Sequence, residues 1–184
     1  MFKSILSFGR PSNRHVTDAL YEAIVASARQ PHFYSAWEVP DTPLGRYEML
    51  SLHVFLFLER ARGRQDGMPE LAQDLTDEFF KDMDHSLREL GIGYMGVPKR
   101  MKKLAKMFYG RAGSYRAAIE AGDGPGLAAA LARNVQPQRP DWPHAGALAA
   151  YVRQASAALA AQDDEEILAG RIAFPRAGEQ EAGT

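Results

Sequence analysis

The stretch PLGRYEMLSLHVFLFLERAR, residues 43–62, is apolar on nearly every side of the helix that it is expected to form. Pro43 suits a first helical turn, and Asp41 or Thr42 before it can cap the unpaired backbone amides. A helix that is apolar all round must be covered by other helices, because one contact face would leave much of it in water. This stretch therefore predicts the central helix of a helical bundle.

Further helices are expected on both sides of residues 43–62. Upstream, residues 16–29 carry apolar side chains at helical spacing. Downstream, every fourth residue from 71 to 87 is apolar. Glycines at 91, 93 and 96 then end one helix, and Pro98 opens another that is expected to bury its apolar face, including Tyr109. Two alanine-rich helices follow at 127–134 and 144–161.

This pattern predicts an all-α fold, a single-domain irregular bundle of about six helices. Residues 1–14 are expected to form a mobile N-terminal segment and residues 15–121 the helical core. Residues 122–169 are predicted to be an alanine-rich helical part of the same domain, and residues 170–184 a flexible tail. Hydrophobic residues make up 46% of the chain and charged residues 24%, which is typical of a globular domain.

Composition excludes several classes of function. The chain has no cysteine, so disulfides, thiol nucleophiles and cysteine-ligated metals are ruled out. Its net charge of −1 predicts no general attraction to DNA. The most apolar stretch, residues 49–58, is about half as long as a membrane span, and the first residues lack the apolar run of a secretion signal. We therefore expect a cytoplasmic protein.

The helix after Pro98 has a basic outer face, with no acidic residue between Val97 and Ile119. Its cations could bind anionic lipid headgroups, RNA phosphates or an acidic protein surface. They could equally complement the acidic face of the preceding helix, and the sequence leaves both readings open. The cations are Lys99, Arg100, Lys102, Lys103, Lys106, Arg111 and Arg116.

A second ambiguous feature is the aromatic loop between Pro31 and Pro40, which carries Phe33, Tyr34 and Trp37. Aromatic rings between prolines can plug the end of a bundle or line a groove for an apolar partner. The first use is the commoner one, and the sequence does not decide between them.

Catalytic chemistry finds little support in the sequence. Glu78, Asp82 and His85 are spaced so that they could share one helical face and bind a metal. A dinuclear bundle site also needs a second Glu-x-x-His, which the chain lacks, so a solvated acidic face is the preferred interpretation. His53 is best explained as a hydrogen-bonded core histidine. We predict no catalytic residue, no metal site and no cofactor.

Several strings together resemble the ubiquinol-cytochrome c chaperone family, whose members assist assembly of the cytochrome bc1 complex. The resemblance covers about residues 21–115, and Tyr94 departs from it because an acidic residue is expected there. The strings are ARQPHFY at 28–34, VPDT at 39–42, GRYE at 45–48, LH at 52–53, FFKDMD at 79–84, LRELGIG at 87–93, VPKRMK at 97–102 and FYGR at 108–111.

The resemblance implies a helical, non-enzymatic chaperone that holds newly made cytochrome b. It further implies the translating ribosome and a small co-chaperone as partners, and a bacterial form lying against the inner face of the cytoplasmic membrane. The anionic membrane surface is a further candidate partner. The alternatives are a peripheral membrane or RNA-binding adaptor that acts through the basic helix, and a metal-binding helical-bundle enzyme.

Two groups of residues are candidates for function under the chaperone reading. Phe33, Tyr34 and Trp37 are candidate client contacts, and Lys99, Arg100, Lys102, Lys103 and Lys106 are candidate electrostatic contacts. A third group could form an internal polar network instead: Arg46, Glu48, His53, Asp82, Asp84 and Arg88.

Overall fold

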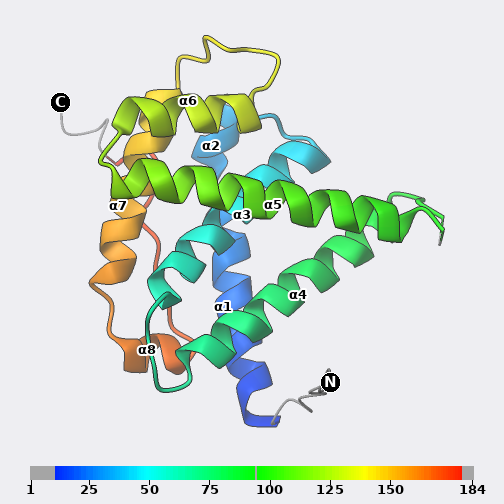
Figure 1. Cartoon of the computed structure of the whole chain (residues 1–184), viewed down its shortest axis with the longest axis vertical. Coiled ribbons are helices and arrows are strands. Elements are labelled where there is room, and N and C mark those ends of the chain that lie inside the picture. The colour runs from blue at the N-terminus through cyan, green and yellow to red at the C-terminus, as the bar shows by residue number, and fades with distance from the viewer. Residues whose placement is uncertain (1–10, 94, 180–184) are drawn as a thin grey trace, which may run out of the picture.

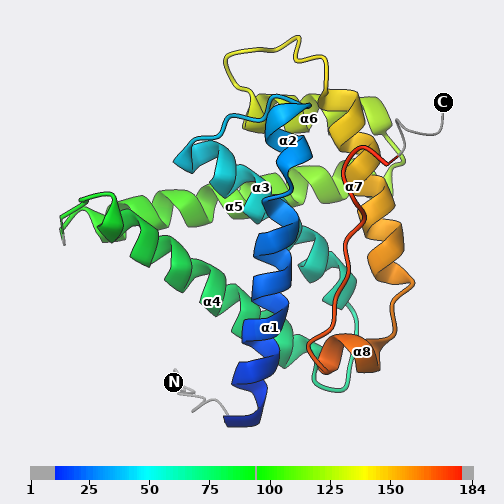
Figure 2. The same cartoon turned by 180° about the vertical axis from the view of Figure 1, so that it is seen from behind.

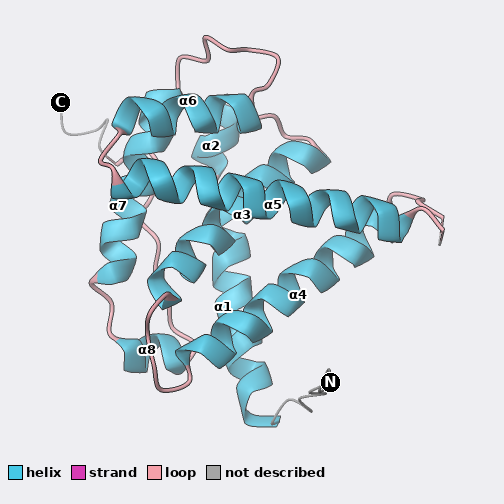
Figure 3. Cartoon of the chain, viewed as in Figure 1, coloured by secondary structure: helices cyan, strands magenta, loops and turns pink. Residues whose placement is uncertain are grey.

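A computed structural model describes residues 11–93 and 95–179 of the 184-residue chain (Figure 1). Within these ranges the fold is all-α, with no strand (Figure 3), which confirms the predicted fold class. Six helices have at least 12 residues and two have five. The elements are α1 (Pro11–Ala28), α2 (Pro31–Ser35), α3 (Pro43–Ala61), α4 (Met68–Glu89), α5 (Val97–Glu120), α6 (Gly124–Val135), α7 (Ala145–Ala160) and α8 (Asp164–Leu168).

Helix α3 is the centre of the bundle, as its all-round apolar sequence predicted. It contacts α1, α4, α5, α6 and α7, and most of its side chains are buried. Thr42 caps its first turn, because the Thr42 hydroxyl accepts a hydrogen bond from the Gly45 amide at 3.1 Å. Glycine is required at position 45, since a Cβ atom there would lie 1.9 Å from the Pro40 carbonyl oxygen. Cap and glycine together set where α3 starts and how closely residue 40 approaches it.

Helices α4 and α5 pack on α3 and converge at one end. The apolar stripe of α4 is buried at Leu71, Leu75, Phe79 and Met83, in agreement with its four-residue spacing. Tyr109 of α5 was expected in the core but is 58% exposed, because it follows Phe108, which takes the buried position. None of the helices in the described ranges combines the length and apolar character that crossing a bilayer requires.

The two ends of the chain differ from the predicted boundaries. Residues 1–10 of the predicted mobile segment lie outside the described residues, and α1 already begins at Pro11. Residues 170–179 belong to the predicted flexible tail, but they pack against the core and run back along the bundle to the region of α2 (Figure 2). The Phe174 ring lies 5.1 Å from the His53 ring, and the Ala177 amide donates to the Gln30 side chain. Ile172, Phe174 and Ala177 anchor this segment, because they pack against the core.

Candidate functional site

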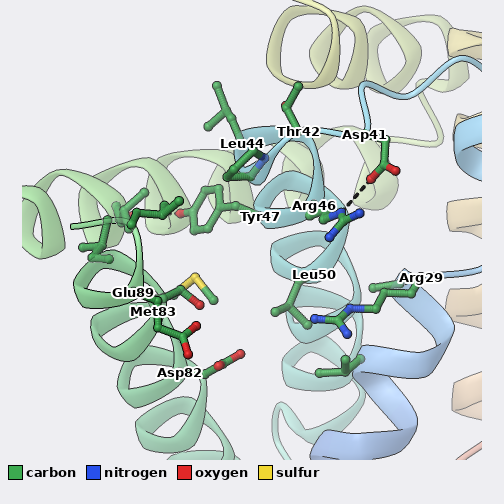
Figure 4. Close-up of a pocket in the computed structure, with 17 residues that line it drawn as sticks. Arg29, Asp41, Thr42, Leu44, Arg46, Tyr47, Leu50, Asp82, Met83 and Glu89 are labelled. Atoms are coloured by element: carbon green, nitrogen blue, oxygen red, sulfur yellow. Dashed lines mark hydrogen bonds and ion pairs between the residues drawn. The ribbon is translucent and has the colours of Figure 1, made fainter. Parts of the chain in front are cut away.

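A cavity of about 570 Å³ opens between the C-terminal halves of α1 and α4 and the N-terminal half of α3 (Figure 4). Leu104 of α5 completes its wall. Two leucines at the cavity are unusually accessible, Leu44 at 50% and Leu90 at 59% exposure. The cavity is therefore an apolar recess that is open to solvent. Its apolar lining includes Val25, Ala28, Leu44, Tyr47, Leu50, Met83, Leu87, Leu90 and Leu104.

Charged side chains surround this recess. Arg46 donates to Asp41 at 2.6 Å, and this hydrogen bond holds the pKa of the Asp41 carboxyl below its usual range. On the opposite wall Asp82 accepts a 2.7 Å hydrogen bond from the Tyr21 hydroxyl. Arg29 also lines the cavity and forms no ion pair with any described residue (Figure 4). The recess thus offers apolar surface together with one cation that is still available.

None of the three aromatic residues proposed as client contacts lines this recess, and two of them, Phe33 and Trp37, are buried in the core, which corrects the prediction for these two. Phe33 and Trp37 are 0% and 3% exposed, and the Phe33 ring packs edge-on against Tyr151 at 5.0 Å. Tyr34 is half-buried, and its hydroxyl donates to the Ala28 carbonyl oxygen at 2.9 Å. The aromatic segment folds into α2 and plugs the bundle, because its rings find a ready apolar pocket between α3 and α7.

The six residues considered as one polar network form separate pairs instead. Arg46 binds Asp41, Asp82 binds Tyr21, and Arg88 binds Asp84 at 2.6 Å on the exposed face of α4. Glu48 and His53 are both buried, but they contact different helices. A single network is ruled out because their α3 side chains face α5 and α7 respectively.

The first buried polar contact joins α3 to α5. Arg111 Nη2 lies 2.7 Å from Glu48 Oε1, and the Arg111 guanidinium also sits 6.0 Å from the centre of the Tyr47 ring. Burial raises the pKa of Glu48 to about 7, and the positive charge of Arg111 acts in the opposite direction. This contact fixes the two helices relative to each other.

The second buried polar contact joins α3 to α7. His53 Nδ1 lies 2.8 Å from the Met49 carbonyl oxygen, and Nε2 lies 2.8 Å from the Tyr151 hydroxyl oxygen. A carbonyl can only accept, so Nδ1 carries the proton and Nε2 accepts from Tyr151. Burial lowers the pKa of His53 to about 4, so the ring is neutral at neutral pH. His53 is the hydrogen-bonded core histidine that the sequence favoured.

The metal hypothesis gains no geometric support. Glu78 pairs with Lys81 at 2.9 Å, and His85 lies 3.2 Å from Glu89. Asp82 turns to Tyr21, so the three candidate ligands point to different partners. Across the described part of the chain no group of three or more histidine, aspartate or glutamate side chains could hold a metal ion.

The basic face of α5 divides into two sets of cations. Arg111 and Arg116 turn towards α3, where they bind Glu48 and Glu59. The other five are exposed and make no ion pair with any described residue. These five therefore do not complement the acidic face of α4. They are Lys99, Arg100, Lys102, Lys103 and Lys106.

Comparison with known proteins identifies the family. The sequence model of the ubiquinol-cytochrome C chaperone family matches residues 35–174. The chain belongs to this chaperone family. Its structure is similar to the crystal structure of the Cbp3 homolog from Brucella abortus, with a TM-score of 0.86 and 56% sequence identity, over 91% of this chain and 93% of that one. No curated protein sequence matches the chain.

The cavity of this chaperone-family member was not predicted from the sequence. Leu44 was assigned to the all-round apolar helix, and Arg29 was not singled out. The sequence indicated a role for Leu44 and Arg29 only weakly, because each lies at a helix end, where apolar and cationic groups can remain accessible. Glu48 and Arg111 carried a clearer signal, since both lie in the strings GRYE and FYGR that marked the family. The departure at Tyr94 lies outside the described residues.

Proposed function

We propose that this protein is a non-enzymatic assembly chaperone of the cytochrome bc1 complex and that it holds newly made cytochrome b. Membership of the ubiquinol-cytochrome c chaperone family carries the first part of this proposal. The open apolar recess beside α3 supports the second part, because cytochrome b is very apolar and needs a covering surface before it joins its partners. A holding chaperone requires such a surface and no reacting group.

The recess suits a short apolar segment of the client. Leu44 and Leu90 remain half or more exposed at its rim, where a bound segment would remove them from water. Leu50 and Met83 are buried beneath it and give it a firm floor. Arg29 would remain available to a carboxylate or a backbone carbonyl at the end of that segment. Apolar contact supplies the affinity, and the cation helps to orient the client.

The working place that we propose is the cytoplasmic side of the membrane, where cytochrome b emerges. The five exposed cations of α5 would bring the chaperone to an anionic partner there. The translating ribosome and a small co-chaperone are further proposed partners, on the strength of the family alone. No part of this arrangement calls for a cofactor.

Site-specific crosslinking tests the client and the recess together. The chain has no cysteine, so Leu44→Cys and Leu90→Cys each provide one position for a photoreactive label. We expect both labels to crosslink to cytochrome b during its synthesis in membranes of the source cell. A label at Ala161→Cys, an exposed position at the end of α7, serves as the control and should not crosslink.

A deletion strain measures the outcome in the cell. Reduced-minus-oxidised haem spectra should show selective loss of cytochrome b, with an independent terminal oxidase unchanged. Complementation by the double variant Leu44→Glu and Leu90→Glu should fail, whereas Ala161→Glu should restore the spectrum. Normal cytochrome b levels in the deletion strain would contradict the proposed function.

The second candidate function is a peripheral membrane or RNA-binding adaptor. The observation in its favour is the set of five exposed cations without ion pairs in the described structure. It predicts normal cytochrome b in the deletion strain, together with salt-sensitive binding of the purified protein to anionic lipid or RNA.

A further inference from the structure

Helices α4 and α5 meet at the far end of an arm that projects from the rest of the molecule (Figures 1 and 2). Gly91, with a φ of 76°, turns the chain after α4, and α5 begins at Val97. We call residues 90–93 and 95–106 the arm tip. This position allows the arm tip to approach an extended surface.

Large apolar side chains are exposed at the arm tip. Within the described ranges four large hydrophobic residues are exposed, and the arm tip contains two of them, Leu90 at 59% and Met95 at 89%. Leu90 also borders the cavity, whereas Met95 does not line it. Two large apolar side chains in water at the end of an arm indicate a contact surface.

The arm tip is also strongly cationic. Lys99, Lys103 and Lys106 recur at steps of four and three, so they share one face of α5, and Lys102 lies beside them. This face is opposite to the buried residues Val97 and Phe108. No acidic residue occurs between residues 90 and 119, so nothing within this stretch neutralises the cations.

We propose that the arm tip docks on an anionic lipid bilayer, with Leu90 and Met95 entering the headgroup region and the lysines binding lipid phosphates. Exposed aliphatic side chains beside a row of cations are the combination that interfacial segments use. Lysine stems cover apolar surface while their ammonium groups stay at the headgroups. The inference rests on the proposed location at the membrane. Leu90 also lies at the rim of the cavity, so Met95 and the lysines, which do not line the cavity, distinguish membrane docking from client binding.

The chemistry of the arm tip favours lipid over RNA. Proteins that bind single-stranded RNA place aromatic rings or arginine planes against the bases. The large apolar side chains exposed at the arm tip are instead a leucine and a methionine, which gain little from contact with bases, and Arg100 is its one arginine. A bilayer accommodates both the aliphatic side chains and the cations in one flat contact.

Vesicle co-sedimentation tests the docking. The full-length protein is mixed with vesicles of phosphatidylcholine alone, or of phosphatidylcholine with phosphatidylglycerol, at low and high salt. We expect binding to the anionic vesicles only, weakened by salt. Lys99→Gln with Lys103→Gln should lower the partition coefficient about fivefold for each charge removed. The control, Arg133→Gln with Arg153→Gln, removes the same charge from exposed positions on α6 and α7 and should bind as the unaltered protein does.

A fluorescent label tests the insertion. An environment-sensitive dye on Met95→Cys should shift to the blue with anionic vesicles, and the same dye on Ala161→Cys should not. Met95→Ser should weaken binding while leaving the helical circular dichroism spectrum unchanged, since this side chain is exposed and does not line the cavity.

Three results would overturn the proposal. The first is absence of binding to anionic vesicles at low salt. The second is equal loss of binding in the lysine variant and in its arginine control. The third is a dye on Met95→Cys that responds to single-stranded RNA and not to vesicles, which would assign the arm tip to RNA. Cytochrome b crosslinking at Leu44→Cys is measured separately, so the chaperone proposal can stand or fall independently.

Discussion

Replacing Glu48 by glutamine should make the stability of the protein rise with pH between about pH 5 and 6.5. Two buried groups on α3 contribute to stability in this pH range, and their contributions change with pH in opposite directions. His53 has its pKa lowered to about 4 by burial, so its contribution to stability is present above its unfolded value of 6.5 and is lost as the pH falls. Glu48 has its pKa raised to about 7, so its contribution is present below its unfolded value of 4.5 and is lost as the pH rises.

The two contributions should nearly cancel in the unaltered protein. A difference of one in pKa corresponds to about 1.4 kcal/mol, so each group changes the free energy of unfolding by about 2 kcal/mol between roughly pH 5 and 6.5. Glu48→Gln removes the contribution that decreases with rising pH, so the free energy of unfolding of this variant should increase by about 2 kcal/mol from roughly pH 5 to 6.5. In His53→Gln the free energy of unfolding should instead decrease by a similar amount. Glutamine keeps a polar group beside Arg111 or Tyr151 in each case.

Urea unfolding followed by helical circular dichroism at several pH values provides the measurement. Each substitution is expected to lower stability at every pH by breaking a buried contact, so the pH slope is the quantity that matters. Opposite slopes in the two variants, on either side of a flat profile for the unaltered protein, are the expected result. Three parallel profiles would refute the assignment of these two groups as buried and oppositely shifted.

Two further predictions concern parts of the fold that the sequence assigned differently. Phe33→Ala should lower the free energy of unfolding by about 3–5 kcal/mol, because the ring is fully buried; a surface role in client binding would leave the urea midpoint unchanged. Truncation after Gly170 should destabilise the protein by removing Phe174 from the His53 ring, and should speed hydrogen exchange in the middle of α3. An unchanged exchange pattern would show that residues 171–179 do not cover the core.

The helical periodicity of apolar residues made most of the helices predictable. Residues 43–62 required a surrounding shell, and the four-residue stripe of α4 marked its buried face, because helix geometry alone decides which side chains share a face. The exposure of Lys99, Lys103 and Lys106 followed for the same reason. Residues 31–37 were less predictable, since Pro31 and the nearby Pro40 concealed the five-residue helix α2.

The sequence by itself determined an all-helical chain with α3 at its centre, because apolar periodicity states which faces must leave water. Only the tertiary structure decided what covers each face. The cavity is built from α1, α3, α4 and α5, whose contributing residues are far apart along the chain, and no local pattern encodes their meeting. The same holds for Glu48 with Arg111 and for His53 with Tyr151. Periodicity records that a side chain is buried, whereas its partner depends on how the helices cross.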